Sequence, residues 1–128
     1  MNETPSDSSP DISDYAPSEG TQLAWKTYRY ILPQKFQDIE QLRDAYLAKL
    51  QSEHNAFRRA EKVDELGHGV AVVSVEGEPA AVGSLTFHKT DRNEYLVHAA
   101  SSAGNENGSV RLAAAVVSRL TRMLDSLR

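Results

Sequence analysis

The sequence contains no cysteine in its 128 residues. This absence excludes a disulfide framework, a thiol nucleophile and any metal site built on thiolates. Long apolar runs are missing as well, since none approaches the roughly 18–20 residues that a helix needs to cross a bilayer. The first residues, Met1 to Pro5, have neither the basic nor the apolar region of a secretory signal. These absences favour a cytoplasmic location and argue against a membrane partner.

An excess of basic charge is also missing. Residues 1–20 hold five of the 18 acidic side chains and no lysine or arginine, so this segment carries −5. The rest of the chain holds all 14 basic and the remaining 13 acidic side chains, which gives +1. A nearly neutral body argues against binding to nucleic acid or to an anionic membrane surface.

The first 20 residues differ in composition from the rest of the chain. They are rich in Ser, Pro, Asp and Glu, and beyond Met1 their apolar residues are Ile12, Tyr15 and Ala16. Such a segment buries too little surface to offset the entropy lost on ordering. We therefore predict a disordered acidic tail over 1–20 and a single domain over 21–128, in keeping with the usual size of one domain.

The first half of the predicted domain reads as a strand followed by a long helical region. A run dense in aromatic and β-branched residues begins near Leu23 and ends before Pro33, which predicts a strand. Asp38 is suited to cap a helix, and apolar residues follow at helical spacing as far as Ala60. The helical region is predicted to reach about residue 66, with room for a break at 52–55.

The second half reads as three strands and a helix. Two apolar runs, Val70–Val75 and Ala80–Phe87, flank Gly77 and predict a β-hairpin. A turn over 90–93 leads to a third run, Tyr95–Ala100, and then to a glycine-containing loop over 101–109. Residues 109–127 form the clearest amphipathic pattern, with apolar side chains on one helical face. The predicted fold is α+β with the order β-α-β-β-β-α, an antiparallel sheet and helices packed mainly on one face.

The side chains of these strands alternate between the two faces of the sheet. With turns at 76–77 and 90–93, the face expected to meet the helices carries Val70, Val72, Ala81, Leu85, Phe87, Leu96 and His98. The opposite face is also largely apolar, whereas an antiparallel sheet with one solvated face normally alternates apolar and polar residues. We therefore expect the second face to pack against another protein or a second copy of the chain, through Val73, Val75, Val82, Tyr95 and Val97.

No residue pattern in the sequence predicts catalysis. His88 and His98 could in principle bind a metal, but the predicted register places them on opposite faces of the sheet. Ser101 follows His98 closely without a Gly-x-Ser-x-Gly turn, so a hydrolase site is not expected. The sequence thus predicts no metal, no cofactor and no catalytic residue.

One part of the chain resembles a known family. The order of elements, the segment Tyr28–Ile31 before Asp38, the hairpin over 75–83 and the following strand, glycine loop and helix resemble the first half of a GNAT acetyltransferase, over residues 24–125. In that family, backbone amides of a Gln/Arg-x-x-Gly-x-Gly/Ala motif at the strand–helix junction hold the coenzyme A pyrophosphate. Over residues 105–110, Gly108 alone matches that motif.

The resemblance implies an anion or coenzyme A site at the start of the last helix. Free backbone N–H groups and the helix dipole attract phosphate or carboxylate at such a terminus. The residues implied are Asn105, Gly108, Ser109 and Arg111.

Double-stranded-RNA-binding domains also place three strands between two helices, and a lysine-rich clamp opens their last helix. Here the stretch from Ser109 to Ala113 holds one basic residue, so RNA binding is not expected. The sequence favours a non-catalytic protein-interaction module, such as an adaptor, a small chaperone or an inhibitor or immunity-type protein. The alternative is a degenerate GNAT-like domain that binds coenzyme A or another anion.

Overall fold

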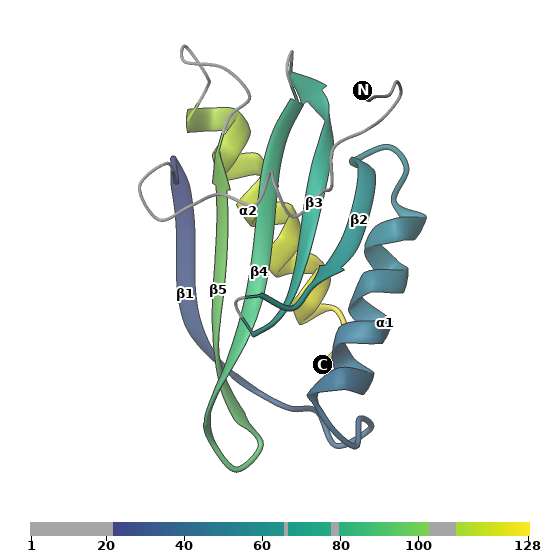
Figure 1. The fold of residues 1–128 in the computed structure, drawn as a ribbon, viewed down its shortest axis with the longest axis vertical. Helices are drawn as coiled ribbons and strands as arrows, with labels where there is room; N and C mark the ends of the chain where they lie inside the picture. Colours follow the sequence, from purple (N-terminus) through teal and green to yellow (C-terminus); the bar gives the residue numbers. More distant parts are fainter. Residues whose placement is uncertain (1–21, 66, 78–79, 103–109) are drawn as a thin grey trace, which may run out of the picture.

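The computed structural model describes residues 22–65, 67–77, 80–102 and 110–128. The described elements are β1 (Ala24–Ile31), α1 (Ile39–Ser52), β2 (Phe57–Val63), β3 (His68–Gly77), β4 (Ala80–Asp91), β5 (Glu94–Ser102) and α2 (Val110–Asp125). They form a five-stranded sheet and two helices, which confirms the predicted α+β class (Figure 1). The tail predicted over residues 1–20 lies outside the described residues.

The sheet has the strand order β1-β5-β4-β3-β2, and every neighbouring pair is antiparallel. The strands β2 to β5 form a meander in which each strand lies beside the next one along the chain. The first strand joins this meander beside β5, and α1 carries the chain from that edge to β2 at the opposite edge. Among the residues that the structure describes, the two edges of the sheet are therefore β1 and β2.

The second half of the predicted first helix is a strand, so that prediction was wrong. The predicted helix start is confirmed: the backbone N–H of Gln41 donates to Asp38 Oδ1 at 2.9 Å. The helix ends at Ser52, and Phe57–Val63 forms β2. A β-bulge between Phe57 and Arg59 shifts the register of this strand. It lets Phe57 and Ala60 both face the core, and this spacing of three imitates a helical pattern.

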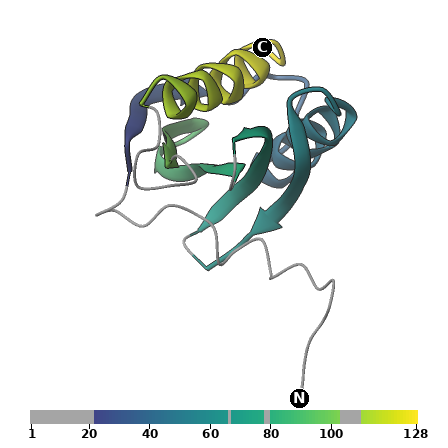
Figure 2. The ribbon, with the colours of Figure 1, turned by 90° about the horizontal axis from the view of Figure 1, so that it is seen from above.

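Both helices lie on the same side of the sheet, as predicted (Figure 2). The first helix packs on β2 and β3, and the second packs on β1, β5 and β4. We call this side the helix face. Its strand residues include Tyr28, Tyr30, Ala60, Val70, Val72, Leu85, Phe87, Val97 and Ala99.

The opposite side is not covered by any described helix or strand, and we call it the open face. The strand registers assign to it Trp25, Thr27, Arg29, Ile31, Arg59, Glu61, Val63, Ala71, Val73, Val82, Ser84, Thr86, His88, Leu96, His98 and Ala100.

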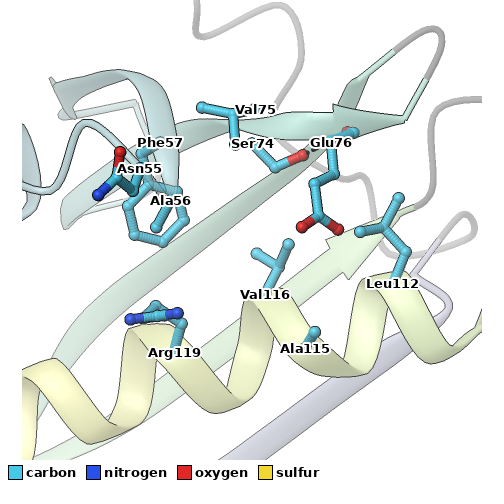
Figure 3. A pocket seen from close by; sticks show the side chains of 10 residues that line it. All are labelled: Asn55, Ala56, Phe57, Ser74, Val75, Glu76, Leu112, Ala115, Val116 and Arg119. Carbon is cyan, nitrogen blue, oxygen red and sulfur yellow. Dashed lines mark hydrogen bonds between the residues drawn. The ribbon is translucent and has the colours of Figure 1, made fainter.

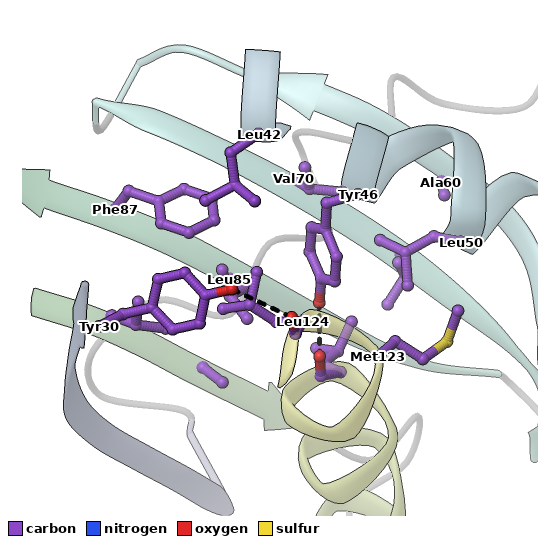
Figure 4. Packing of buried hydrophobic residues seen from close by; sticks show 14 of the residues in the cluster. Tyr30, Leu42, Tyr46, Leu50, Ala60, Val70, Leu85, Phe87, Met123 and Leu124 are labelled. Atoms are coloured by element: carbon purple, nitrogen blue, oxygen red, sulfur yellow. Dashed lines mark hydrogen bonds between the residues drawn. The ribbon is translucent and has the colours of Figure 1, made fainter. Parts of the chain in front are cut away.

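Two buried tyrosines form hydrogen bonds with the backbone of the second helix (Figure 4). The hydroxyl of Tyr46, on α1, donates to the carbonyl oxygen of Leu120 at 2.8 Å. The hydroxyl of Tyr30, on β1, donates to the carbonyl oxygen of Leu124 at 3.2 Å. The ring of Tyr46 also meets Phe87 edge-on, at 82° and 6.5 Å between centroids. The two hydrogen bonds tie α1 and β1 to the C-terminal half of α2, and the ring contact joins β4 to α1.

The amphipathic prediction for the last helix is confirmed. Leu120 is fully buried against the sheet, whereas Arg122 is exposed. Gly83 of β4 lets the helix come close: a Cβ at this position would lie 2.7 Å from Val116 Cγ1 and 3.2 Å from the carbonyl oxygen of Ala100. A glycine is therefore needed where α2 crosses the sheet.

The register between β4 and β5 differs by one residue from the predicted one. The hairpin extends to the pair Asp91–Glu94, so its turn is short and places Asn93 at φ 60°. A register shift between Lys89 and Asp91 then sets Leu85 opposite Ala99 instead of His98. A slip of one residue moves every side chain of a strand to the other face. The prediction of which residues face the helices is confirmed for β3 and β4. For β5 it was wrong, because the two faces of that strand are exchanged.

Candidate interaction surface

The open face has two parts that differ in exposure. Its middle, over β3, β4 and β5, combines the small residues Ala71, Ser84 and Ala100 with larger ones such as Val82 and Thr86, and Ala71, Ala100, Val82 and Thr86 are each at most 9% exposed. Its margin along β1 carries Trp25 at 63% and Ile31 at 52% exposure, with Leu96 of β5 at 37%. On β1 and β5, the large apolar side chains that remain in water therefore lie together at the β1–β5 margin.

We define the β1–β5 margin by Trp25, Thr27, Arg29, Ile31, Leu96 and His98. Trp25 stands opposite the small Ala100, and Arg29 stands opposite Leu96. The Nε atom of Arg29 lies 3.9 Å from Glu94 Oε2, and the Arg29 side chain is largely exposed. Tryptophan and arginine are the residue types that most often dominate the binding energy of protein interfaces.

Two histidines lie on this face, and this corrects the prediction that they occupy opposite faces. His98 is opposite Thr86, and His88 is opposite Leu96. The Nδ1 atom of His98 lies 2.8 Å from Thr27 Oγ1, and its Nε2 lies 3.3 Å from Gln22 Oε1. Both ring nitrogens therefore have hydrogen-bond partners. In the described part of the chain, no group of three or more His, Asp or Glu side chains is placed to hold a metal ion.

The predicted interface residues divide between the two faces. Val73 and Val82 lie on the open face, where Val73 packs against a small cluster of Val63 and Ala71. Val75, near the end of β3, is 37% exposed. Tyr95 and Val97 instead lie on the helix face and are buried in the core, because of the register of β5. These two residues cannot contact a partner without unfolding the sheet.

Sequence patterns missed Trp25 and Ile31 as members of an exposed surface. Both belong to β1, and its place beside β5 depends on a crossover through α1 from one edge of the sheet to the other. The alternation of Trp25, Thr27, Arg29 and Ile31 with Tyr28 and Tyr30 was visible in the sequence. It did not show which set would face the helices.

A cavity of about 90 Å³ lies between α2 and the ends of β2 and β3 (Figure 3). Its lining combines apolar side chains with Glu76 and Arg119, and Arg119 Nη1 lies 3.7 Å from Glu53 Oε1. Small-molecule sites usually enclose about 300–1,000 Å³. This cavity is therefore too small for a ligand the size of coenzyme A.

Most of the anion site implied by the resemblance cannot be placed. Asn105, Gly108 and Ser109 lie outside the described residues, and Arg111 is exposed in the first turn of α2. Ser101 was predicted to lie in a loop but belongs to β5, where its buried hydroxyl donates to the carbonyl oxygen of Val82 at 2.7 Å. It lies on the helix face and His98 lies on the open face, so the two cannot form a catalytic pair.

Among the described helices, none is both long and apolar enough to span a membrane. Comparison with known proteins gives no relative: no protein-family model matches the chain, and no curated protein matches it significantly.

Proposed function

We propose that this chain is a non-catalytic protein-interaction module, which binds a partner protein through the β1–β5 margin of the open face. The observation that carries the proposal is the exposure of Trp25, Ile31 and Leu96 together on one face. The neighbouring large apolar residues of the same strands, such as Tyr30 and Val97, are fully buried on the helix face. An exposed group of this kind is typical of a surface that a partner covers.

The shape of the face supports contact with a protein surface rather than with a small molecule. The small residues Ala71, Ser84 and Ala100 lie side by side across β3, β4 and β5, so a helix or sheet of a partner can approach the backbone closely along this row. Trp25 and Leu96 then supply large apolar contacts beside this row of small residues. Full burial of such side chains contributes roughly 1.5–3 kcal/mol each.

The charges of the open face favour a partner without strong net charge. Arg29 and Glu94 lie close together at one end, and Arg59 and Glu61 form an ion pair of 2.7 Å on β2. Opposite charges therefore alternate over the open face. Polar groups at the border of an interface contribute mainly to specificity and to the rate of association.

The first test is site-specific photo-crosslinking in the native host. A benzophenone amino acid is placed at Ser84, on the open face, and in a matched variant at Arg122, on the exposed side of α2. We expect one partner to be captured from position 84 and not from position 122. Equal capture from both positions would contradict the proposed surface.

The second test measures affinity for the captured partner. Trp25→Ala should weaken binding about 30-fold or more, which corresponds to the loss of roughly 2 kcal/mol at an interface anchor. Leu96→Ala should weaken binding by a smaller factor, and Arg122→Ala should leave it unchanged. If Trp25→Ala binds as tightly as the natural chain, the β1–β5 margin is not the binding surface.

A further inference from the structure

The two edge strands of the sheet are protected to very different degrees. β2 contains a bulge and carries Arg58, Arg59, Glu61 and Lys62 within its seven residues. Bulges and charged side chains are the usual means by which proteins prevent the pairing of exposed edges. β1 has eight residues without proline or glycine, and it pairs with β5 in one continuous register from Ala24 to Ile31. Its outer edge is thus suited to accept another strand (Figure 1).

The pairing of β1 with β5 determines which backbone groups of β1 point away from the sheet. The N–H of Leu32 donates to the carbonyl oxygen of Asn93 at 2.8 Å, just beyond the end of the strand. Since hydrogen-bonded residues alternate along an antiparallel strand, the even-numbered residues bond to β5. The N–H and C=O groups that point away from the sheet therefore belong to Trp25, Thr27, Arg29 and Ile31. The side chains of these same residues lie on the open face.

We propose that β1 pairs antiparallel with β1 of a second copy of this chain, around a two-fold axis at Tyr28. This register sets Trp25 opposite the partner's Ile31 and Thr27 opposite the partner's Arg29. The two most exposed apolar side chains of the strand, at 63% and 52%, therefore cover each other twice in the dimer. Cross-strand pairs of an aromatic with a β-branched residue stabilise a sheet.

The neighbouring symmetric registers fit less well. An axis at Arg29 would place two arginine side chains directly opposite each other, and this juxtaposition of like charges is destabilising. An axis at Thr27 would set Trp25 opposite the partner's Arg29 and would leave Ile31 beyond the paired core of the strand. Only the axis at Tyr28 pairs all the outward-facing residues from Trp25 to Ile31 with one another.

The paired strands would join the two sheets, so that their open faces form one continuous surface. Pro33 has no N–H group and sets the limit of the pairing at one end of each strand. This inference concerns the edge of β1 and does not rest on the proposed binding of a partner to the face. Because the contact is confined to one strand from each copy, we expect a weak, reversible dimer.

The test uses the full chain and its lack of cysteine. Sedimentation equilibrium over a range of concentrations should show a reversible monomer–dimer equilibrium. Thr27→Pro removes an outward N–H without removing a bond to β5, and it should weaken the dimer at least tenfold. Thr27→Ala keeps the N–H and should still dimerise. Unchanged circular dichroism of Thr27→Pro would show that its sheet is intact.

Register is tested with the single variants Thr27→Cys and Arg29→Cys. Oxidation of their mixture should give a covalent dimer, since paired residues lie within disulfide reach. Either variant alone should cross-link much less.

A natural chain that stays monomeric at high concentration, or a Thr27→Pro variant that dimerises fully, would overturn the inference. Efficient cross-linking of Thr27→Cys with itself would overturn the register. A Leu96→Ala variant, altered on β5 and not on the edge of β1, that loses affinity for the captured partner but still dimerises would separate this inference from the proposed function.

Discussion

The helix face and the open face use the same five strands but differ in the size of their side chains. On the helix face, the large residues Tyr30, Leu85 and Val97 are fully buried beneath the helices. On the open face, Ala71 and Ala100 are as deeply buried, although no described helix covers them. Apolar composition alone therefore does not show that a face needs a partner. Exposed large residues are the stronger sign, and Trp25, Ile31 and Leu96 supply them along β1 and β5.

Truncation of a large core residue should give the greatest contrast between the faces. Leu120→Ala, on the buried side of α2, should lower the free energy of unfolding by roughly 2–5 kcal/mol. Leu96→Ala, on the open face, should lower it by about 1 kcal/mol or less, because that side chain already meets water. Urea denaturation measures both values, and equal losses would mean that the faces are assigned incorrectly.

Neighbouring residues of β4 allow a closer comparison. Gly83→Val should destabilise the fold by roughly 1–3 kcal/mol, because the added atoms meet Val116 of α2 and the backbone of Ala100. Ser84→Val points to the open face and should change stability by no more than about 0.5 kcal/mol. A Gly83→Val variant as stable as Ser84→Val would show that α2 does not approach β4 so closely.

Two buried tyrosine hydroxyls can be compared, because Tyr46 has a hydrogen-bond partner and Tyr28 has none among the described residues. Tyr46→Phe removes the bond to Leu120 and should cost about 0.5–1.5 kcal/mol. The hydroxyl of Tyr28 is buried and has no hydrogen-bond partner among the described residues. Burial, with Asp125 nearby, also raises the pKa of Tyr28 well above its usual value. Tyr28→Phe should therefore leave thermal stability unchanged or raise it, and a loss like that of Tyr46→Phe would reveal a missing partner.

The smallest expected effect is on the loss of stability at acidic pH. Arg43 of α1 is buried, and its Nη1 lies 2.6 Å from Asp64 Oδ1. The hydrogen bond from Arg43 lowers the pKa of Asp64, so its contribution is present above the unfolded pKa of about 4 and is lost as the pH falls through the lower folded value. Asp64→Asn should reduce the loss of stability between neutral and acidic pH, as followed by thermal melts. An unchanged pH dependence would contradict this role of the pair.

Much of the fold was predictable from local patterns. The Asp38 cap, the amphipathic α2 and the strands β1, β3 and β4 each follow from signals within a short stretch of sequence. Two errors arose where one residue changes the periodicity. The bulge in β2 gave Phe57 and Ala60 a helical spacing, and the register shift between Lys89 and Asp91 reversed the faces of β5.

The candidate surface was less predictable than the fold, because it depends on long-range pairing. The reversed register moved Tyr95 and Val97 from the expected interface into the core, and it brought Leu96 and His98 to the open face. The exposure of Trp25 arises from the pairing of β1 with β5, which is distant in sequence. No local signal in β1 specifies that neighbour.

Binding of a partner through the β1–β5 margin can be followed by the fluorescence of Trp25, the one tryptophan of the sequence. Its emission is measured while the captured partner protein is added to a fixed concentration of the chain. If the partner covers the β1–β5 margin, the emission should move to shorter wavelength and saturate together with binding. Saturated binding with unchanged Trp25 emission would show that the partner binds elsewhere and would contradict the account.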